Sequence, residues 1–324
     1  MKGDEVNRII FVPQYPTPMR YQEWWFWELE KEFRGAGFDV IVLGKDKAHE
    51  MIHTRTIPGN KAMFSPIDMA IEFECAQIEE YVALKIDKND ILFLSDISFP
   101  GLFCNVLFHK KPDKMFAFCH ATSLNHLDYF AKERQFKFPI ETTHSKMFDA
   151  IFVGSEYHKA RLQWDNTVVT YLPFHPFQSY NLPRVNDIIS ASRPTPQKVD
   201  VDVERRVEVV YSKIIRRDAR TWQEYFKFLA ESKVLLITSH EDTFGYQIVD
   251  AVMNGCIPVA PRRCSYPELL PDAYLYNNDG ELFEILDKAL WGLLDVPKLK
   301  CRVGMNNFYN KIISEITKEV DYPF

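Results

Sequence analysis

Two aspartates in the C-terminal third of the chain, Asp242 and Asp250, lie eight residues apart around a short turn. Eight residues are just over two helical turns, so the two carboxylates can face the same side of a helix. Thr243 is a suitable N-cap for a helix that begins at Phe244, and Gly245 lets a ligand approach the unpaired N–H groups there. The pattern predicts a corner that binds hydroxyl groups or an anion.

A second pair of residues with chemical potential, Arg193 and Lys198, lies five residues apart just after an apolar run at 188–192. Arginine offers a planar fork and lysine a point charge, and both bind phosphate oxygens. Two cations this close in sequence suit an anionic ligand such as a phosphate group. The alternative is a solvated pair in a proline-rich linker.

The N-terminal half contains a series of apolar runs of strand length, and the strands they form would position the residues of such a site. The opening is β-α-β, which implies parallel strands. Strands that are apolar throughout indicate a sheet covered on both faces, as in doubly wound α/β domains. The expected strands are 8–13, 39–43, 90–94, 115–119, 150–153 and 167–172, and the expected helices are 22–33, 73–86 and 155–164.

A cluster of prolines after residue 172 marks a linker, and the α/β alternation then resumes. We expect an N-terminal domain at 1–183, a C-terminal domain at 187–300 and a last segment at 301–324. Two such domains face a cleft, and ligands bind beyond the carboxyl ends of their strands. The expected C-terminal strands are 188–192, 207–211, 233–238 and 257–260, and the expected helices are 220–230, 244–254, 281–290 and 305–316.

Composition limits the class of protein. At roughly 150 residues per domain, the 324 residues suggest two domains. A net charge of −6 argues against a polycation that binds nucleic acid through its overall charge. The sequence predicts neither a secretory signal nor a membrane span, and its six scattered cysteines are typical of reduced thiols. We therefore expect a cytoplasmic protein. The alternative for the cysteines is a disulfide framework or a zinc site.

The segment from Asp242 through Gly255-Cys-Ile-Pro-Val resembles the Glu-x7-Glu signature of retaining GT-B glycosyltransferases of family four. The resemblance implies a GT-B fold of two Rossmann-like domains. It also implies that Asp242, with the backbone at Thr243, Phe244 and Gly245, holds the sugar of a nucleotide-sugar donor, and that Asp250 binds the ribose. This chain has Asp where the family has Glu, and Glu241 is an alternative sugar ligand.

The same resemblance gives roles to residues outside that segment. It implies that Arg193 and Lys198 neutralise the donor diphosphate, so that no metal and no other cofactor is needed. It implies that His120, which follows the run at 115–119, faces the transferred sugar. It further implies retention of anomeric configuration and a last helix that returns to the N-terminal domain.

Residues 255–276, with Tyr-Pro-Glu at 266–268 and Tyr-Leu-Tyr at 274–276, are also similar to tRNA-queuosine mannosyltransferases. That likeness covers the last third of the chain and implies a hydroxylated base of DNA or tRNA as the acceptor. Only about forty residues separate Lys198 from Glu241, which leaves the choice between a UDP-sugar and a GDP-sugar open.

Two basic stretches agree with a nucleic-acid acceptor. Residues 205–220 carry six basic side chains against two acidic ones, among them Arg216 and Arg217. Residues 110–146 interleave seven Lys and Arg side chains with Tyr129, Phe130, Phe136 and Phe138, a combination that suits phosphate contact and base stacking. Ordinary solvated faces are the alternative.

The sequence thus predicts a hexosyltransferase whose acceptor side includes Gln14, Arg216 and Arg217. A lipid or cell-surface glycan is the alternative acceptor. A GT-B protein that binds a nucleotide sugar without catalysis is the alternative class.

Overall fold

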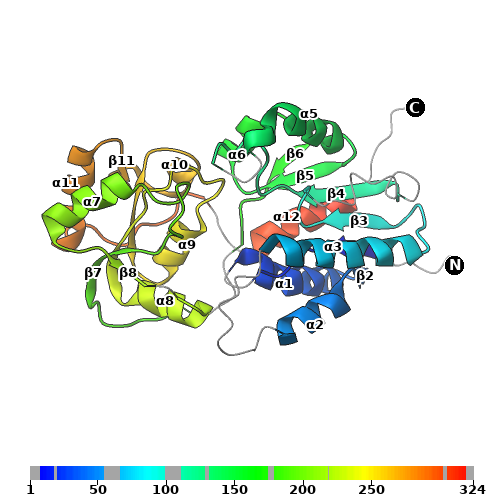
Figure 1. The fold of residues 1–324 in the computed structure, drawn as a ribbon, viewed down its shortest axis with the longest axis horizontal. Coiled ribbons are helices and arrows are strands. Elements are labelled where there is room, and N and C mark those ends of the chain that lie inside the picture. The colour runs from blue at the N-terminus through cyan, green and yellow to red at the C-terminus, as the bar shows by residue number, and fades with distance from the viewer. Residues whose placement is uncertain are drawn as a thin grey trace.

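The computed structural model contains two sheets of parallel strands that lie side by side (Figure 1). The N-terminal part of the chain forms one sheet and the C-terminal part forms the other. The structure describes residues 8–17, 20–54, 66–98, 111–127, 131–173, 179–217, 219–301 and 305–318. Lys110, Tyr129 and Phe130 of the second basic stretch lie outside these residues, as does Cys104.

The N-terminal sheet has six parallel strands in the order β2-β1-β3-β4-β5-β6. Its strands are β1 (Arg8–Val12), β2 (Asp39–Val42), β3 (Ile91–Leu94), β4 (Lys114–Phe118), β5 (Ala150–Val153) and β6 (Thr167–Val169). The helices around it are α1 (Tyr21–Gly35), α2 (Lys45–Thr54), α3 (Pro66–Ala83), α5 (Arg134–Ser145) and α6 (Glu156–Leu162).

Both faces of this sheet are covered, which explains why its strands are apolar throughout. In β1, Ile9 and Phe11 belong to one core cluster together with Phe33 of α1. Ile10 belongs to the opposite cluster together with Tyr81 of α3. Because successive side chains of a strand point to opposite faces of the sheet, a sheet buried on both faces requires strands with an uninterrupted run of apolar residues.

The C-terminal sheet has five parallel strands in the order β11-β10-β9-β7-β8. Its strands are β7 (Asn186–Ser190), β8 (Ile215–Arg216), β9 (Ser232–Leu236), β10 (Ile257–Pro261) and β11 (Leu275–Tyr276). The helices around it are α7 (Val201–Tyr211), α8 (Trp222–Ala230), α9 (Tyr246–Met253), α10 (Tyr266–Leu269) and α11 (Asp279–Leu290).

The expected strand at 207–211 is wrong, because these residues form the end of α7. The Asp200 carboxylate caps that helix by accepting hydrogen bonds from the N–H groups of Asp202 and Val203. The valines of this segment favour a strand by propensity. Only one helical face is buried, however, so Val207 is fully buried while Val209 is 82% exposed.

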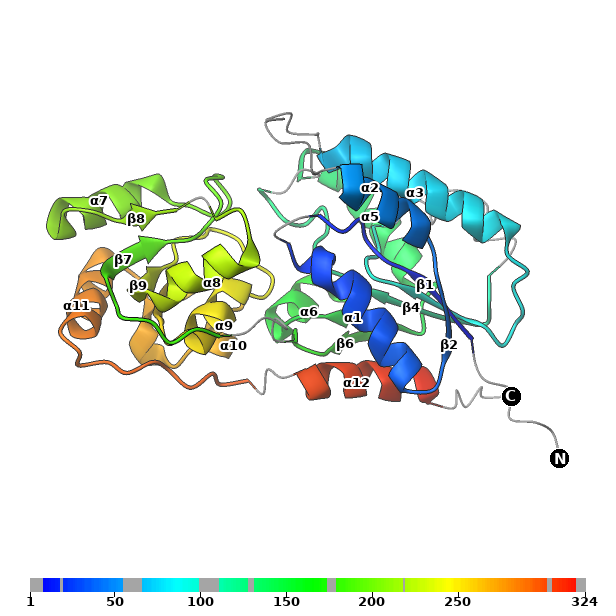
Figure 2. The same ribbon diagram turned by 90° about the horizontal axis from the view of Figure 1, so that it is seen from below.

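The last helix, α12 (Met305–Thr317), lies along the N-terminal layer, which is the six-stranded sheet with its helices, and not beside the C-terminal sheet (Figure 2). The Phe308 ring packs 5.2 Å from the Trp25 ring of α1. Lys311 donates a hydrogen bond to the carbonyl of Val169 at the end of β6. Among the described residues, no helix has the length and apolar composition needed to cross a membrane.

The N-terminal layer contacts the C-terminal layer, which is the five-stranded sheet with its helices, through hydrogen bonds at the start of α6. The Glu268 carboxylate of α10 accepts from the N–H groups of Glu156 and Tyr157, at 2.8 and 2.6 Å. Ser155, the N-cap of α6, donates its hydroxyl to the carbonyl of Thr243. A carboxylate is favoured at a helix N-terminus, so this contact joins α10 to the N-terminal layer.

Candidate active site at the edges of the two sheets

The turn after β9 is organised by the side chain of Asp242. Its Oδ1 accepts hydrogen bonds from the N–H groups of Phe244 and Gly245, at 3.3 and 3.1 Å. Gly245 has a φ of +97° and serves as the N-cap of α9, whose first residue is Tyr246. The prediction that Thr243 caps a helix starting at Phe244 is therefore wrong, because the side chain of Asp242 takes those N–H groups instead.

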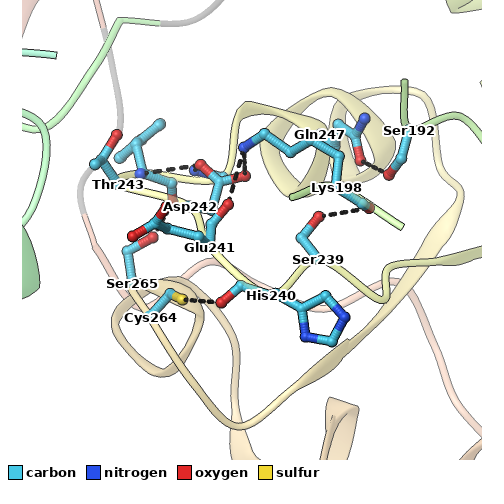
Figure 3. A network of polar contacts seen from close by, with 12 residues as sticks. Ser192, Lys198, Ser239, His240, Glu241, Asp242, Thr243, Gln247, Cys264 and Ser265 are labelled. Carbon is cyan, nitrogen blue, oxygen red and sulfur yellow. Dashed lines mark hydrogen bonds and ion pairs between the residues drawn. The ribbon is translucent and has the colours of Figure 1, made fainter. Parts of the chain in front are cut away.

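Lys198 lies against this turn. Its Nζ is 2.9 Å from Asp242 Oδ2 and donates to the carbonyl of Glu241 at 3.2 Å (Figure 3). The Tyr266 hydroxyl is 3.3 Å from the same Asp242 oxygen. The Lys198 and Asp242 side chains are 19% and 20% exposed, so solvent reaches the pair.

The loop that carries Lys198 is tied to the end of β9 by its own backbone. Ser239 donates its hydroxyl to the carbonyl of Lys198 at 3.0 Å, and the Asp200 N–H donates to Thr238 Oγ1 at 2.9 Å. Arg193 is exposed at the other end of this loop. The structure thus places both predicted cations in one loop and brings Lys198 to Asp242.

Asp250 lies in a different environment from Asp242. It is 5% exposed on α9 and accepts a hydrogen bond from the Tyr225 hydroxyl of α8 at 3.1 Å. Burial raises the pKa of Asp250 to about 7, while the Tyr225 bond acts in the opposite direction. Asp242 precedes α9, so the expectation that both carboxylates share one helical face is not met.

Glu241 faces the N-terminal layer. Its carboxylate is 4% exposed and accepts hydrogen bonds from the N–H groups of His126 and Leu127, at 3.0 and 3.2 Å. Arg161 of α6 lies 3.1 Å away as its ion-pair partner. Glu241 therefore joins the two layers, and Asp242 is the acid of this pair that meets Lys198.

Two polar residues that the sequence did not single out stand next to the Lys198 loop. The Ser192 hydroxyl is 3.0 Å from Gln247 Oε1, and Gln247 Nε2 donates to the carbonyl of Ala191 at 3.3 Å. Gln247 lies in the first turn of α9, three residues before Asp250. That spacing could have identified it, because residues three apart are neighbours on a helix.

His120 follows β4 and is 9% exposed. Its Nε2 is 3.1 Å from the carbonyl oxygen of Ser95. Burial lowers the pKa of His120 to about 3, so the ring is neutral at pH 7. Because a carbonyl oxygen only accepts, the proton is on Nε2, and Nδ1 is left as a hydrogen-bond acceptor.

An aromatic contact connects His120 to the C-terminal layer. The Tyr21 ring of α1 lies 4.4 Å from the His120 ring and stacks 6.0 Å from the ring of Tyr246 at the start of α9. Trp25 Nε1 donates to the Tyr246 hydroxyl at 3.2 Å. The first turn of α9 is therefore adjacent to the side chains that surround His120.

Arg216 and Arg217 lie on the C-terminal layer, away from Gln14. Arg216 ends β8, pairs with the buried Glu204 of α7 and donates to Ser190 Oγ at 3.1 Å. Arg217 lies 3.3 Å from a Glu231 carboxylate oxygen and stacks over the Phe228 ring. Both arginines thus contact side chains of the C-terminal domain, and their role on the acceptor side stays a prediction.

Gln14 follows β1 and points to the end of β3. Its N–H donates to Ser95 Oγ at 2.5 Å, and its Nε2 donates to Asp96 Oδ2 at 2.6 Å. It lines a pocket of about 110 Å³ in the N-terminal layer. Nowhere in the described part of the chain do three His, Cys, Asp or Glu side chains come together as metal ligands would.

Solved structures with the same arrangement of sheets span nearly the whole chain. HepE from Anabaena, in complex with UDP-glucose, is 14% identical, has a TM-score of 0.59 and covers 88% of this chain and 90% of its own. Sucrose-phosphate synthase from Thermosynechococcus elongatus has a TM-score of 0.60 at 13% identity, with 96% and 95% covered. This chain has the GT-B fold.

The GT-B fold predicted from the sequence is thereby confirmed. The lipopolysaccharide outer core galactosyltransferase WaaB is a further similar structure, with a TM-score of 0.59, 13% identity and coverage of 95% of this chain and 99% of its own. No family model matches the sequence. A segment of 103 residues is 28% identical to tRNA-queuosine alpha-mannosyltransferase from Drosophila melanogaster, which is 32% of this chain and 26% of that protein.

Proposed function

We propose that this protein is a retaining glycosyltransferase that moves a hexose from a UDP- or GDP-sugar to a hydroxylated acceptor. The observation that supports it best is the pairing of Lys198 with Asp242 beyond the carboxyl end of β9, where ligands bind in doubly wound sheets. HepE, which has the same fold, binds UDP-glucose.

The charges at this site suit a nucleotide sugar. Lys198 and Arg193 would neutralise the diphosphate as it leaves, and Asp242 would accept a hydrogen bond from a hydroxyl of the sugar. The donor would replace the present contact between Lys198 and Asp242. We infer that the reaction needs no metal, because two cations of the chain itself meet the diphosphate charge.

His120 would act as a hydrogen-bond acceptor for the transferred sugar. Its neutral ring and its Nδ1 atom allow it to hold a hydroxyl at neutral pH. Fixed groups of this kind position the sugar and stabilise charge without moving during the reaction. We assign the ribose to Asp250 together with Gln247, whose amide lies on the same helix nearer the Lys198 loop.

For the acceptor, we propose a modified base in DNA or tRNA. The partial likeness to tRNA-queuosine alpha-mannosyltransferase supports this choice. On the N-terminal layer, Lys132, Arg134 and Lys146 are exposed around α5, and Phe136 is 61% exposed among them. Cations beside an exposed aromatic ring suit phosphate contact and base stacking. Such an acceptor fits a cytoplasmic enzyme.

A donor and acceptor screen tests the proposal. UDP- and GDP-activated glucose, galactose and mannose are incubated with bulk tRNA or hydroxymethylated DNA, and nucleosides are then analysed by mass spectrometry. We expect one nucleoside to gain the mass of a hexose, with Lys198→Ala as the inactive control. Consumption of the donor without any labelled nucleoside would contradict the nucleic-acid acceptor, and donor binding without any turnover would indicate a binding protein.

A further inference from the structure

A pocket outside the Lys198 site opens beyond the carboxyl ends of β1 and β3. Its volume is about 110 Å³. A cavity of roughly 150 Å³ holds benzene, so this pocket admits a small group of about five non-hydrogen atoms. Its polar lining comes from α1, α3 and the loops after β1 and β3, and includes Gln14, Gln22, Glu74, Gln77 and Asp96.

Two carboxyl groups give the pocket its charge. Asp96 is 8% exposed, and its oxygens accept from Gln14 Nε2 at 2.6 Å and from the Ser98 N–H at 2.9 Å. Glu74 of α3 is partly buried and also lines the pocket. Burial, and for Glu74 also the nearby Asp96, raises the pKa of both to about 7. No lysine or arginine is among the described residues that line the pocket.

Amide oxygens add further acceptors. Gln77 is completely buried, and its Nε2 donates to the carbonyls of Pro13 and Leu43 at 2.8 and 3.2 Å. Within the described residues its Oε1 has no hydrogen-bond partner, and the same holds for Oε1 of Gln22. A buried acceptor without a donor is costly, so a pocket occupant that brings N–H groups would be stabilised here.

We propose that this pocket binds a protonated aliphatic amine on the acceptor, between the carboxyls of Asp96 and Glu74 and the amide oxygen of Gln77. This inference rests on the proposed function and specifies the acceptor further. An ammonium supplies three donors and one positive charge, which matches a lining of acceptors. A phosphate would be repelled by the two carboxyls.

The pocket stands next to the predicted reaction centre. Asp96 directly follows Ser95, whose carbonyl holds His120 and whose hydroxyl accepts from the N–H of Gln14. Gln22 is likewise next in sequence to Tyr21, whose ring packs on His120. An amine held in the pocket would therefore present a neighbouring hydroxyl of the same molecule towards His120.

Small probes test the charge preference directly. Protein labelled with ¹⁵N in its glutamine side chains is titrated with butylammonium or with 1-butanol, each of five non-hydrogen atoms, at pH 7.5, and amide shifts are followed by NMR. We expect butylammonium to bind at least tenfold more tightly than 1-butanol and to shift the Gln77 amide. Asp96→Asn and Glu74→Gln should each weaken it about fivefold or more, while Glu79→Gln, an exposed change on the same helix, should not.

The outcomes separate this inference from the proposed function because UDP and GDP binding is measured on the same samples. Equal binding of the two probes, or equal losses in Glu79→Gln and Glu74→Gln, overturns the amine pocket even when nucleotide binding is intact. A preference for the ammonium in a protein that binds neither nucleotide supports the pocket and contradicts the proposed function. If Asp96→Asn does not fold, the partly exposed Glu74→Gln decides the result.

Discussion

Lys198 Nζ lies 2.9 Å from Asp242 Oδ2, although 44 residues separate the two in the sequence. The cation comes from the loop after β7 and the carboxylate from the loop after β9, and these strands are neighbours in the sheet. Each side chain is thus held beside a partner that a nucleotide sugar would replace. Loss of Lys198 should therefore affect binding of the donor's diphosphate, and loss of Asp242 should affect binding of its sugar.

Lys198→Ala should lower turnover by about a hundredfold to a thousandfold, or roughly 2.7–4 kcal/mol of transition-state stabilisation. The reason is the loss of a positive charge beside the departing diphosphate. Single-turnover kinetics with the nucleotide sugar measures it. Lys288→Ala, which removes an exposed lysine of α11, is the matched control. Full activity of Lys198→Ala, or an absolute dependence on a metal removed by EDTA, would contradict the assignment.

Asp242→Ala should spare the free nucleotide and weaken the intact nucleotide sugar, because its predicted partner is a sugar hydroxyl. The expected loss for the sugar nucleotide is about tenfold, the value of one charged hydrogen bond. Calorimetry with UDP and a UDP-sugar, or the GDP pair, separates the two effects. Asp250→Ala should weaken both ligands alike. Identical profiles for the two variants would show that the two roles are wrongly divided.

Asp250→Asn should change how stability depends on pH. In the folded protein the pKa of Asp250 is raised to about 7, against roughly 3.9 in an unfolded chain. Between these values the folded state binds more protons, so this group's contribution to stability falls as pH rises from about 4 to 7 and is constant above.

Asparagine removes that dependence and still accepts the Tyr225 hydrogen bond. The stability of Asp250→Asn relative to wild type should therefore increase by roughly 1–3 kcal/mol between pH 5 and pH 8. Urea unfolding at both pH values measures it. A difference that does not vary with pH would show that Asp250 titrates normally.

Glu241→Ala should weaken the contact between the two layers. It removes the partner of Arg161 and leaves two N–H groups, those of His126 and Leu127, without an acceptor. We expect a loss of about 1–3 kcal/mol and a larger radius of gyration by X-ray scattering. Glu284→Ala, at an exposed site on α11, is the control. An unchanged radius and melting temperature would refute an interdomain role for Glu241.

Charge reversal on α5 tests the nucleic-acid surface. Lys132→Glu together with Arg134→Glu should weaken tRNA or DNA binding and reduce its dependence on salt, because each phosphate contact adds to the salt slope. Fluorescence anisotropy at several salt concentrations measures the slope. Lys288→Glu together with Lys298→Glu, at two exposed positions, changes the net charge equally and is the control. A protein that binds a nucleotide sugar but no nucleic acid at low salt would favour the lipid or glycan acceptor.

The sequence by itself determined the six N-terminal strands, three of the C-terminal strands, the fold class and the loops that hold the site. Runs such as Ile9–Phe11 are apolar at every position because both faces of the strand are buried away from water. This requirement acts on consecutive residues, so it can be recognised in the sequence. The loops after β7 and β9 carry Lys198 and Asp242 because parallel strands end at one edge. Propensity failed at Val207, where valines favour a strand but the buried face is helical.

Only the tertiary structure decided which acid meets which cation. Glu241 and Asp242 are adjacent, yet one pairs with Arg161, 80 residues away in the other layer, and the other with Lys198. The packing of α8 on α9 gave Asp250 its buried partner Tyr225. Spacing along a chain fixes which face of an element a side chain occupies. Ion pairs and pKa shifts depend on distance and burial, which arise when remote segments pack together.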